Sequence, residues 1–432
     1  MPLSALVVDI KADPVAVALR LAGRPGFAFL HAAPGTSARP SFLAVDPVES
    51  CTDLLPVEPL LPALAARDTR AAVPRWMGAV PYECARQVER PAWTRRPDER
   101  PAPHLVLPVW RRYGAVVEID PARGLVRVVG DDVARVTSLG RELSAALPSS
   151  RLPFRLEPLD DDPPQAHMER VRRAQELIAR GHLYQVNLAR RQRFSIEGRV
   201  LDGYLALADE APAPFGACIA LGEGGAMCAS SPELFLGIDA QSNLVTVPIK
   251  GTRPRGRDAI EDAKLARELE QSVKEHAELT MILDVERNDL GRVAVPGSVR
   301  LTRGPAVQAH RTIHHRSAVI AARLLPAKRP IDAVRAMFPS GSVTGAPKVR
   351  AMEVIAELEP ARRGLYTGAF GSVAHDGSVT LAMAIRVLSM RDREAHYFAG
   401  GGIVADSDPE AELAETGWKG TQLERLVTPR AP

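Results

Sequence analysis

Short apolar runs alternate with stretches of helical periodicity along this 432-residue chain. The apolar runs, bounded by turn residues, predict strands at 183–194, 215–222, 234–240, 244–251, 378–390 and 396–405. Helical periodicity predicts helices at 167–179, 258–269, 275–290, 331–337, 348–358 and 409–426. Short turns at 239–243 and 375–378 separate strand pairs, as in hairpins. The pattern therefore favours an α+β fold with large antiparallel sheets.

The first 150 residues differ from the rest in composition. They are rich in Pro, Ala and Arg, and their short apolar runs, such as FAFLHA at 27–32, are broken by turn residues. This part is predicted to consist of strands and loops. The segment LEPLDDDPPQ at 156–165 combines acidic residues with paired prolines, which is typical of an exposed connection. We therefore predict an N-terminal part, 1–155, and a C-terminal part, 156–432.

Composition and charge exclude several classes of protein. Hydrophobic residues make up 46% and charged residues 25%, which is typical of a folded globular protein. The net charge of +3 is too small for a nucleic-acid or membrane-surface partner. No apolar segment approaches the length of a membrane-spanning helix, and the four cysteines show no ligand spacing. We expect a cytoplasmic protein without disulfides.

Two pairs of acids fall on apolar helix faces. Glu275 and Glu278 share a face with Ile282 and Val285 at about 100° per residue. Buried ionised carboxylates are costly unless a cation or a proton compensates them. Oxygen ligands without a His/Cys cluster favour Mg²⁺.

The C-terminal helix carries the second pair. Glu412, Glu415 and Lys419 lie on one face, which is predicted to continue as Leu423 and Leu426. Two inward-facing pairs suggest one shared divalent ion. An arginine partner would satisfy the same acids and stays an alternative.

Lysine is rare, with seven occurrences among 55 cationic residues. A lysine can lose its proton and act as a nucleophile, which arginine cannot readily do. Lys250, Lys348 and Lys419 lie in glycine-rich or acidic motifs. The other four, which we expect to be ordinary surface charges, are Lys11, Lys264, Lys274 and Lys328.

Three segments, 338–348, 364–373 and 399–410, are rich in glycine, which alone is also typical of turns. The first places a Gly/Ser/Thr loop directly before a predicted helix, an arrangement that offers amide donors to a carboxylate or phosphate. Thr252 follows Lys250 and Gly251 and adds a hydroxyl. Arg386 interrupts an otherwise apolar strand, where a guanidinium needs an anion. These features favour a substrate that carries carboxylates.

Taken together, the motifs resemble the chorismate-binding enzymes, a family that includes anthranilate, aminodeoxychorismate, isochorismate and salicylate synthases. The motifs are YQVNLARRQRF, SPELFL, PIKGTRPRG, ELTMILDVERNDLGRV, FPSGSVTGAPKVRAMEVIAELEP, YTGAFG, AIRV and AGGGIVADSDPEAELAETGWK, covering about residues 155–425. The resemblance implies large antiparallel sheets packed together with helices on the outside. Residues 1–150 resemble, more weakly, the N-terminal part of the amination branch.

Two positions discriminate within the family. Gln185 stands where isochorismate and salicylate synthases have a water-activating lysine, which disfavours hydration. Lys250 lies in PIKGT, where anthranilate synthases typically read PIAGT and many aminodeoxychorismate synthases have lysine. The resemblance implies that Lys250 attacks chorismate and expels the 4-hydroxyl, and that ammonia then displaces the enzyme. The product, 4-amino-4-deoxychorismate, leads to 4-aminobenzoate and folate.

The resemblance also assigns roles to individual residues. Glu233 would be the general acid, and His314, next to His315 in HHRS, would assist near the leaving group. Glu278 and Glu415 would bind Mg²⁺ directly, supported by Glu275 and Glu412. The residues expected to bind substrate are Gln185, Thr252, Ser342, Tyr366, Arg386, the backbone of Gly402 and Lys419.

The chain shows no glutaminase nucleophile motif, so ammonia would come from a separate glutamine amidotransferase subunit, component II. Anthranilate synthase component I is the nearest alternative, disfavoured by Lys250 and by FLHA in place of an LLES-type tryptophan-inhibition motif. A non-catalytic chorismate-binding subunit is the second alternative. It is disfavoured because the four acids, Glu233 and Lys250 are all present.

Overall fold

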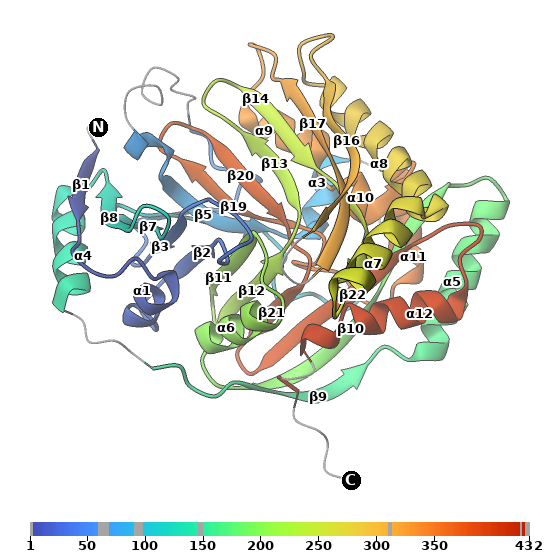
Figure 1. The fold of residues 1–432 in the computed structure, drawn as a ribbon, viewed down its shortest axis with the longest axis horizontal. Coiled ribbons are helices and arrows are strands. Elements are labelled where there is room, and N and C mark those ends of the chain that lie inside the picture. Colours follow the sequence, from blue (N-terminus) through green and yellow to red (C-terminus); the bar gives the residue numbers. More distant parts are fainter. Residues whose placement is uncertain are drawn as a thin grey trace.

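In the computed structural model, two large antiparallel sheets pack face to face and helices cover their outer faces (Figure 1). The structure describes residues 3–58, 69–89, 98–145, 150–309, 313–423 and 426–427. Within these residues one sheet has 12 strands and the other has 10. The predicted α+β class with packed antiparallel sheets is confirmed.

The 12-stranded sheet runs, in spatial order, through β1 (Ser4–Val7), β8 (Leu125–Gly130), β7 (Val116–Asp120), β3 (Ser41–Ala44), β2 (Ala28–His31), β11 (Phe215–Gly222), β12 (Gly225–Ser231), β21 (Val387–Arg391), β22 (Glu394–Ile403), β10 (Gln185–Glu197) and β18 (Gly345–Ala346), with β9 (Arg155–Asp161) also on β10.

The 10-stranded sheet runs through β15 (Ile249–Pro254), β17 (Ile313–Arg323), β14 (Asn243–Val247), β13 (Leu234–Ile238), β20 (Val379–Met383), β19 (Ala369–Ala374), β5 (Pro74–Val80), β6 (Val109–Arg112) and β4 (Glu49–Cys51), with β16 (Arg300–Ala309) also on β17.

The α-helices are α1 (Pro14–Arg20), α3 (Ala85–Val88), α4 (Val133–Ala145), α5 (Pro164–Ala179), α6 (Val200–Glu210), α7 (Ala259–Gln271), α8 (Val273–Gly291), α9 (Pro330–Met337), α10 (Gly341–Thr344), α11 (Lys348–Leu358) and α12 (Pro409–Trp418).

Three apolar clusters hold these layers together. One, with Leu19, Leu139 and Tyr204, lies between the 12-stranded sheet and helices α1, α4 and α6. The second, which includes Met227 and Phe370, fills the space between the two sheets. The third joins the 10-stranded sheet to α8, α9 and α11. Burial of apolar surface in all three clusters is the main stabilising contribution to this fold.

Most of the elements predicted for residues 156–432 are present in the structure. Asp258 caps α7 by accepting hydrogen bonds from two backbone amides, and Ser272 caps α8. Helix α11 spans 348–358 as predicted. Strand pairs β13–β14 and β19–β20 are antiparallel hairpins around the two predicted turns.

Several local predictions were wrong. The N-terminal part contains helices α1 and α4 as well as strands and loops. The acidic segment 156–165 is largely strand β9, which pairs with β10 and places Asp160 2.8 Å from Arg193. Helix α12 ends at Trp418, so Leu423 and Leu426 do not continue its face. The predicted boundary near 155 stays a prediction, because strands from before and after it belong to both sheets.

Two predicted strands are each divided. The run 244–251 forms β14 and β15 with Pro248 between them, and both strands pair with β17. The run 378–390 forms β20 in one sheet and β21 in the other. The break lies at Arg386, whose φ of +50° is in the left-handed region. At this point the chain crosses between the two sheets.

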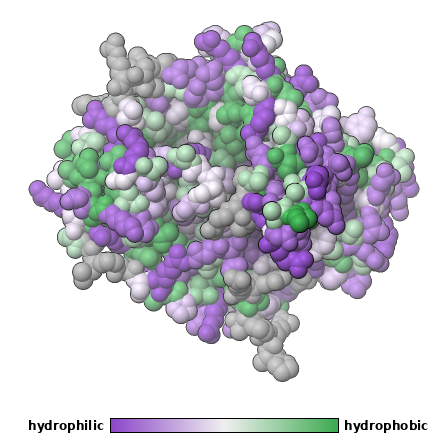
Figure 2. All heavy atoms as spheres, viewed as in Figure 1, coloured by the Kyte–Doolittle hydropathy of each residue, from purple (hydrophilic) through white to green (hydrophobic). Residues whose placement is uncertain are grey.

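Helix α8 is the element that positions the candidate site. It packs against the terminal strand β15 of one sheet and the terminal strand β18 of the other. Its buried face therefore lies where the edges of the two sheets meet. Over α7, α5 and α12, hydrophilic side chains gather on the face shown in Figure 2. None of the described helices combines the length and the apolar character that crossing a membrane requires.

Candidate active site

Glu233 lies between β12 and β13 and is 4% exposed. Its Oε1 accepts a hydrogen bond of 2.7 Å from Ser342 Oγ. Burial raises the pKa of Glu233 to about 7, although the Ser342 hydrogen bond and the charge of Lys250 act in the opposite direction. A carboxyl group that keeps its proton near neutral pH has the property required of a general acid.

Lys250 lies on β15 and is half-buried. The positive charge of Lys250 acts to lower the pKa of three carboxyl groups, those of Glu233, Glu278 and Glu415. Among the described residues, no hydrogen bond or ion pair holds the Lys250 ammonium. An amine close to three acids and bonded to none is available to a ligand.

Glu278, on α8, lies beside Gln185 of β10. Gln185 Nε2 donates to Glu278 Oε2 at 3.4 Å, and Gln185 Oε1 is buried without a hydrogen-bond partner. A Cβ at residue 402 would come within 2.0 Å of Gln185 Nε2, so any larger residue there would displace the Gln185 amide from Glu278. Burial raises the pKa of Glu278, opposed by the charge of Lys250.

The second acid pair projects from α12 toward the glycines of β22. A Cβ on Gly401 would lie 2.9 Å from Glu412 Oε2 and 3.4 Å from Glu415 Oε1. Glu412 is 2% exposed, and its Oε1 accepts from Lys274 Nζ at 3.1 Å, whereas its buried Oε2 has no hydrogen-bond partner. The prediction that Lys274 is an ordinary surface charge was therefore wrong. Burial acts to raise the pKa of Glu415, but Lys419 at 2.6 Å and other lysines hold it below its ordinary value.

Glu275, which completes the first pair, lies against Gly251. A Cβ at residue 251 would stand 2.9 Å from Glu275 Oε2, and Arg253 approaches Glu275 at 3.7 Å. The charges of Lys250 and Lys274 both act to lower the pKa of Glu278. The four acids do not supply three ligand atoms within 4.8 Å of one another.

These residues fit a divalent cation bound by two carboxylates. The raised pKa of Glu278 indicates a carboxyl group whose charge is not fully compensated, and Glu412 Oε2 is buried without a hydrogen-bond partner although Lys274 pairs with the other oxygen. Mg²⁺ commonly takes only one or two protein carboxylates and completes its shell with water and an anionic substrate. Glu278 and Glu415 would hold it, supported by Glu275 and Glu412. A bound Mg²⁺ would neutralise a substrate carboxylate.

Arg386 lies between β20 and β21, and Tyr366 lies before β19. The half-buried Arg386 guanidinium forms no ion pair or hydrogen bond with the described residues, and burial lowers its pKa. Tyr366 stacks on Phe398 with ring centroids 5.4 Å apart. Electrostatic interaction connects Tyr366 to Glu415. A guanidinium without a carboxylate partner is available to a substrate carboxylate.

Two predicted site residues, Thr252 and His314, form hydrogen bonds with residues outside the group made by Glu233, Lys250 and the four acids. Thr252 Oγ1 is 2.9 Å from His315 Nδ1, and His314 Nε2 is 2.9 Å from Asp262 on α7. The adjacent residues His314 and His315 point to opposite faces of β17. No hydrogen bond joins His314 to Glu233 or Lys250.

Sequence reasoning missed three residues around Glu233. Ser340 and Glu286 continue the hydrogen bonds that start at Glu233, and Arg363 holds the nearby backbone. Glu286 lies 11 residues after Glu275, so helical periodicity places it on the same face and could have identified it. Nothing in the local sequence indicates the partners of Arg363.

The Arg363 side chain is fully buried and connects several elements of the site. It pairs with Glu359 at 2.6 Å and donates to the carbonyls of Val343, beside Ser342, and Asn187 on β10. Its guanidinium also lies 5.5 Å from the ring centre of Tyr366. Arg363 therefore links the segments around Asn187, Val343 and Tyr366.

We expect Arg363→Met to lower the free energy of unfolding by about 3–5 kcal/mol, because it leaves the buried Glu359 carboxylate without its cationic partner. Chemical denaturation measures this change. Arg391→Met, which breaks the exposed pair of Arg391 with Glu223, is the control and should change stability by less than about 1 kcal/mol. Equal losses of stability in the two variants would contradict the conclusion that the buried Arg363–Glu359 pair contributes more to stability than an exposed pair.

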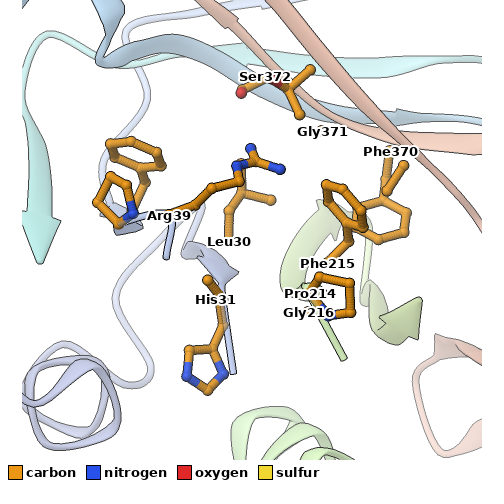
Figure 3. A pocket seen from close by; sticks show the side chains of 14 residues that line it. Leu30, His31, Arg39, Pro214, Phe215, Gly216, Phe370, Gly371 and Ser372 are labelled. Atoms are coloured by element: carbon orange, nitrogen blue, oxygen red, sulfur yellow. The ribbon is translucent and has the colours of Figure 1, made fainter. Parts of the chain in front are cut away.

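A cavity of about 30 Å³ lies between the two sheets, away from the acids (Figure 3). Leu30, His31, Phe215 and Ser372 are among its lining residues, and Arg39 lies 5.0 Å above the Phe215 ring. None of the predicted site residues lines it. The cavity has room for about one water molecule.

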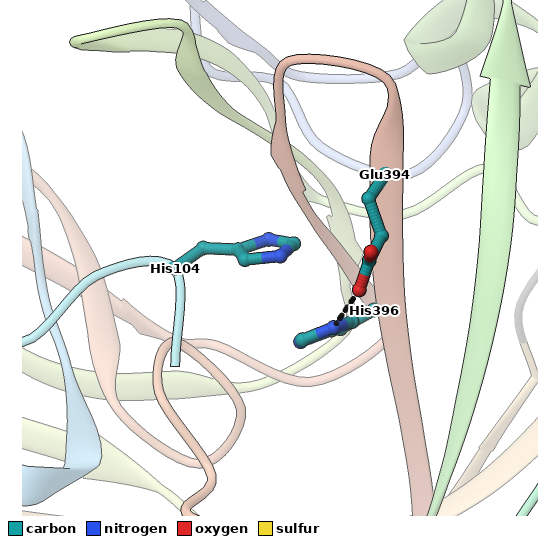
Figure 4. Close-up of side chains that lie close together, drawn as sticks. All are labelled: His104, Glu394 and His396. Atoms are coloured by element: carbon teal, nitrogen blue, oxygen red, sulfur yellow. Dashed lines mark hydrogen bonds and ion pairs between the residues drawn. The ribbon is translucent and has the colours of Figure 1, made fainter. Parts of the chain in front are cut away.

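His104, Glu394 and His396 form a cluster with ligand atoms within 4.8 Å of one another (Figure 4). However, both oxygens of Glu394 already accept from Arg193, and His396 Nε2 lies 2.8 Å from Glu394 Oε1. Hydrogen bonding to Arg193 lowers the pKa of Glu394 to about 2. The negative charge of this cluster is thus already compensated without a metal.

Comparison with known proteins identifies the family. The model for chorismate binding enzymes matches residues 44–425. This match covers most of the chain, and the chain therefore belongs to the chorismate-binding enzyme family. The crystal structure of anthranilate synthase component I from Streptococcus pneumoniae superposes with a TM-score of 0.74 and 27% identity, covering 91% of this chain and 93% of that one.

Sequence relatives carry two different names. Anthranilate synthase component 1 of Streptomyces coelicolor is 41% identical over 300 residues, which are 66% of this chain and 58% of that protein. Aminodeoxychorismate synthase component 1 of Escherichia coli is 45% identical over 248 residues, which are 57% of this chain and 54% of that protein. The chain thus matches less than two thirds of the length of these two relatives. Their identities are too similar to separate the two activities.

Proposed function

We propose that this chain is the ammonia-using component of an aminodeoxychorismate synthase, which converts chorismate and ammonia to 4-amino-4-deoxychorismate and water. The observation that carries the proposal is Lys250, whose ammonium lies close to Glu233, Glu278 and Glu415 but is bonded to none of them. An amine at this place is the nucleophile that a covalent route of ammonia transfer needs.

Each residue then has a chemical task. The neutral amine of Lys250 forms a bond to a carbon of the chorismate ring while the bond to the 4-hydroxyl breaks. Glu233 gives its proton to that hydroxyl, which leaves as water. Ammonia forms its own bond to the ring, Lys250 departs as a neutral amine, and the new ammonium group loses one proton. The enolpyruvyl group is retained throughout.

The substrate carboxylates would be held at two places. Arg386 is a cation without a partner among the described residues and would bind the carboxylate of the enolpyruvyl side, next to Tyr366. The ring carboxylate would face Lys419, the backbone of Gly402 and the Mg²⁺ held by the acids. A glutamine amidotransferase subunit would supply the ammonia.

Anthranilate synthase is the second candidate, favoured by the relatives of that name. Purified chain incubated with chorismate, Mg²⁺ and ammonium at mildly alkaline pH, with products analysed by mass spectrometry, separates the candidates. Aminodeoxychorismate with its pyruvyl group retained supports the proposal, whereas anthranilate plus pyruvate supports the second candidate. No conversion, with chorismate still protecting the chain against unfolding, would support a non-catalytic binding subunit.

The pKa of Glu233 predicts a pH dependence. Since Glu233 must carry a proton and its pKa is raised to about 7, kcat should fall as pH rises above about 7. The measurement keeps the concentration of free NH₃ constant by adjusting total ammonium at each pH. Glu233→Gln should lower kcat by about 10²- to 10⁴-fold and remove this decline. A decline that persists in Glu233→Gln would exclude Glu233 as its origin.

A further inference from the structure

A continuous chain of hydrogen bonds connects Glu233 to a second buried acid. Ser342 Oγ lies 2.7 Å from Glu233 Oε1 and 2.9 Å from Ser340 Oγ, and Ser340 Oγ lies 2.9 Å from Glu286 Oε1. Thr246 Oγ1 donates to the other oxygen of Glu286 at 3.0 Å. All these side chains are buried. The role proposed above for Glu233 leaves Glu286 without a task.

Counting hydrogens shows what this chain of bonds requires. The path from Glu233 to Glu286 has three links, and each link needs one hydrogen between two oxygens. The hydroxyl groups of Ser340 and Ser342 supply two hydrogens. The third must therefore belong to a carboxyl group, so Glu233 and Glu286 together hold one proton.

The environment of the two acids agrees with this count. Burial and, next, the charge of Glu233 together raise the pKa of Glu286 to about 8, so the two carboxyl groups are not both ionised near neutral pH. The other charged groups that act on the pair are Lys250 of β15 and Asp289 of α8, which is paired with Lys348.

Two arrangements of the three hydrogens are possible. In one, Glu286 donates to Ser340, Ser340 to Ser342 and Ser342 to ionised Glu233. In the other, all three hydrogens have shifted, so that Glu233 is protonated and Glu286 is ionised. A concerted shift along the chain converts one arrangement into the other without moving any heavy atom far.

We propose that Glu286 stores the shared proton and delivers it to Glu233 through Ser340 and Ser342, and that Glu233 then gives it to the departing hydroxyl. The inference rests on the proposed function. The delivery moves the negative charge from Glu233 to Glu286, away from the substrate, before the hydroxyl leaves. The proton that ammonia loses on bonding to the ring returns along the same chain, so both acids recover their starting state. Glu286 acts through Glu233 and is a positioning residue rather than a catalytic one.

Glu286→Gln tests this relay. The side-chain amide introduced by the substitution can donate to Ser340 and accept from Thr246, which retains the fold but permanently orients the serine hydroxyls toward ionised Glu233. We expect kcat to fall about tenfold at about pH 7.5, and the alkaline decline in kcat to move about one pH unit lower, with KM for chorismate within about twofold of the original value. An unchanged position of the decline would overturn the relay.

Asp289→Asn is the matched control, because Asp289 is another buried acid of α8 and lies outside the chain of hydrogen bonds. It should lower stability and move the decline much less than Glu286→Gln does, because Asp289 acts on Glu286 only through its charge. A shift equal to that of Glu286→Gln would overturn the relay, since it would show a general effect of removing a buried acid. Active-site titration corrects kcat for the fraction of folded enzyme in each variant.

A second measurement does not need turnover. Infrared spectroscopy at about pH 7 should show the carbonyl band of a buried protonated carboxyl in the original chain, lost or weakened in Glu286→Gln and retained in Asp289→Asn. Absence of the band in the original chain would overturn the shared proton whatever the chain catalyses. Conversely, a chain that shows the band but does not aminate chorismate would refute the proposed function and with it the task of the relay.

Discussion

Replacing Lys250 with alanine is expected to reduce the formation of 4-amino-4-deoxychorismate by about a thousandfold or more. The substitution removes the amine that forms the covalent bond to the ring, while Glu233 and the acids remain in place. Single-turnover analysis by mass spectrometry measures the effect, and trapping of a chorismate-derived adduct on the original chain identifies the bonded residue. A near-normal rate in Lys250→Ala would reject the covalent route.

Lys250→Arg separates nucleophilic from electrostatic action. Arginine keeps the positive charge near Glu233, Glu278 and Glu415 but cannot readily become a neutral amine. We therefore expect Lys250→Arg to be as inactive as the alanine variant. Substantial activity of the arginine variant would assign Lys250 to charge compensation instead of bond formation. In that case the amination of chorismate would proceed by direct attack of ammonia.

Removal of Mg²⁺ is expected to have the second large effect. Excess EDTA should abolish conversion of chorismate, and added Mg²⁺ should restore it, because the acids on α8 and α12 repel an anionic substrate unless a cation neutralises them. Full activity in excess EDTA would reject the four-carboxylate site. A calorimetric titration with Mg²⁺ in the presence of chorismate measures binding independently of turnover.

Substitutions assign this effect to particular acids. Glu278→Gln and Glu415→Gln should each weaken the apparent affinity for Mg²⁺ by about tenfold or more, because each removes one of two direct ligands. Glu268→Gln is the control, since Glu268 on α7 is an exposed acid that pairs only with Lys264 among the described residues. If all three variants bind Mg²⁺ equally, the cation is not held by Glu278 and Glu415.

The predictions from local sequence succeeded where a local signal determines the structure. Helices α7 and α8 begin at the capping residues Asp258 and Ser272, whose side chains accept hydrogen bonds from backbone amides. The seven-residue helix α1 was missed because it is too short to show two full turns of periodicity, although Asp13 caps it in the same way. The α+β class followed from the hairpin spacing.

Other errors arose where the tertiary structure overrides a local pattern. Residues 378–390 form one continuous apolar run, and nothing in that run shows that its halves join different sheets at Arg386. Both sheets are buried on their facing sides, so an apolar strand fits either one. Likewise, strand β9 looked like an exposed connection, because an edge strand tolerates acidic residues that pair with Arg193 of its neighbour.

The candidate site divides in the same way. The sequence by itself determined the family, the kinds of reactive groups and, through helical periodicity, the inward direction of Glu278 and Glu412. Only the tertiary structure decided which groups have partners: Lys274 bonds to Glu412, Ser342 bonds to Glu233, and Lys250 bonds to neither acid. The physical reason is that desolvation and Coulomb interaction depend on distances between segments far apart in the chain, and these set the protonation state of Glu233.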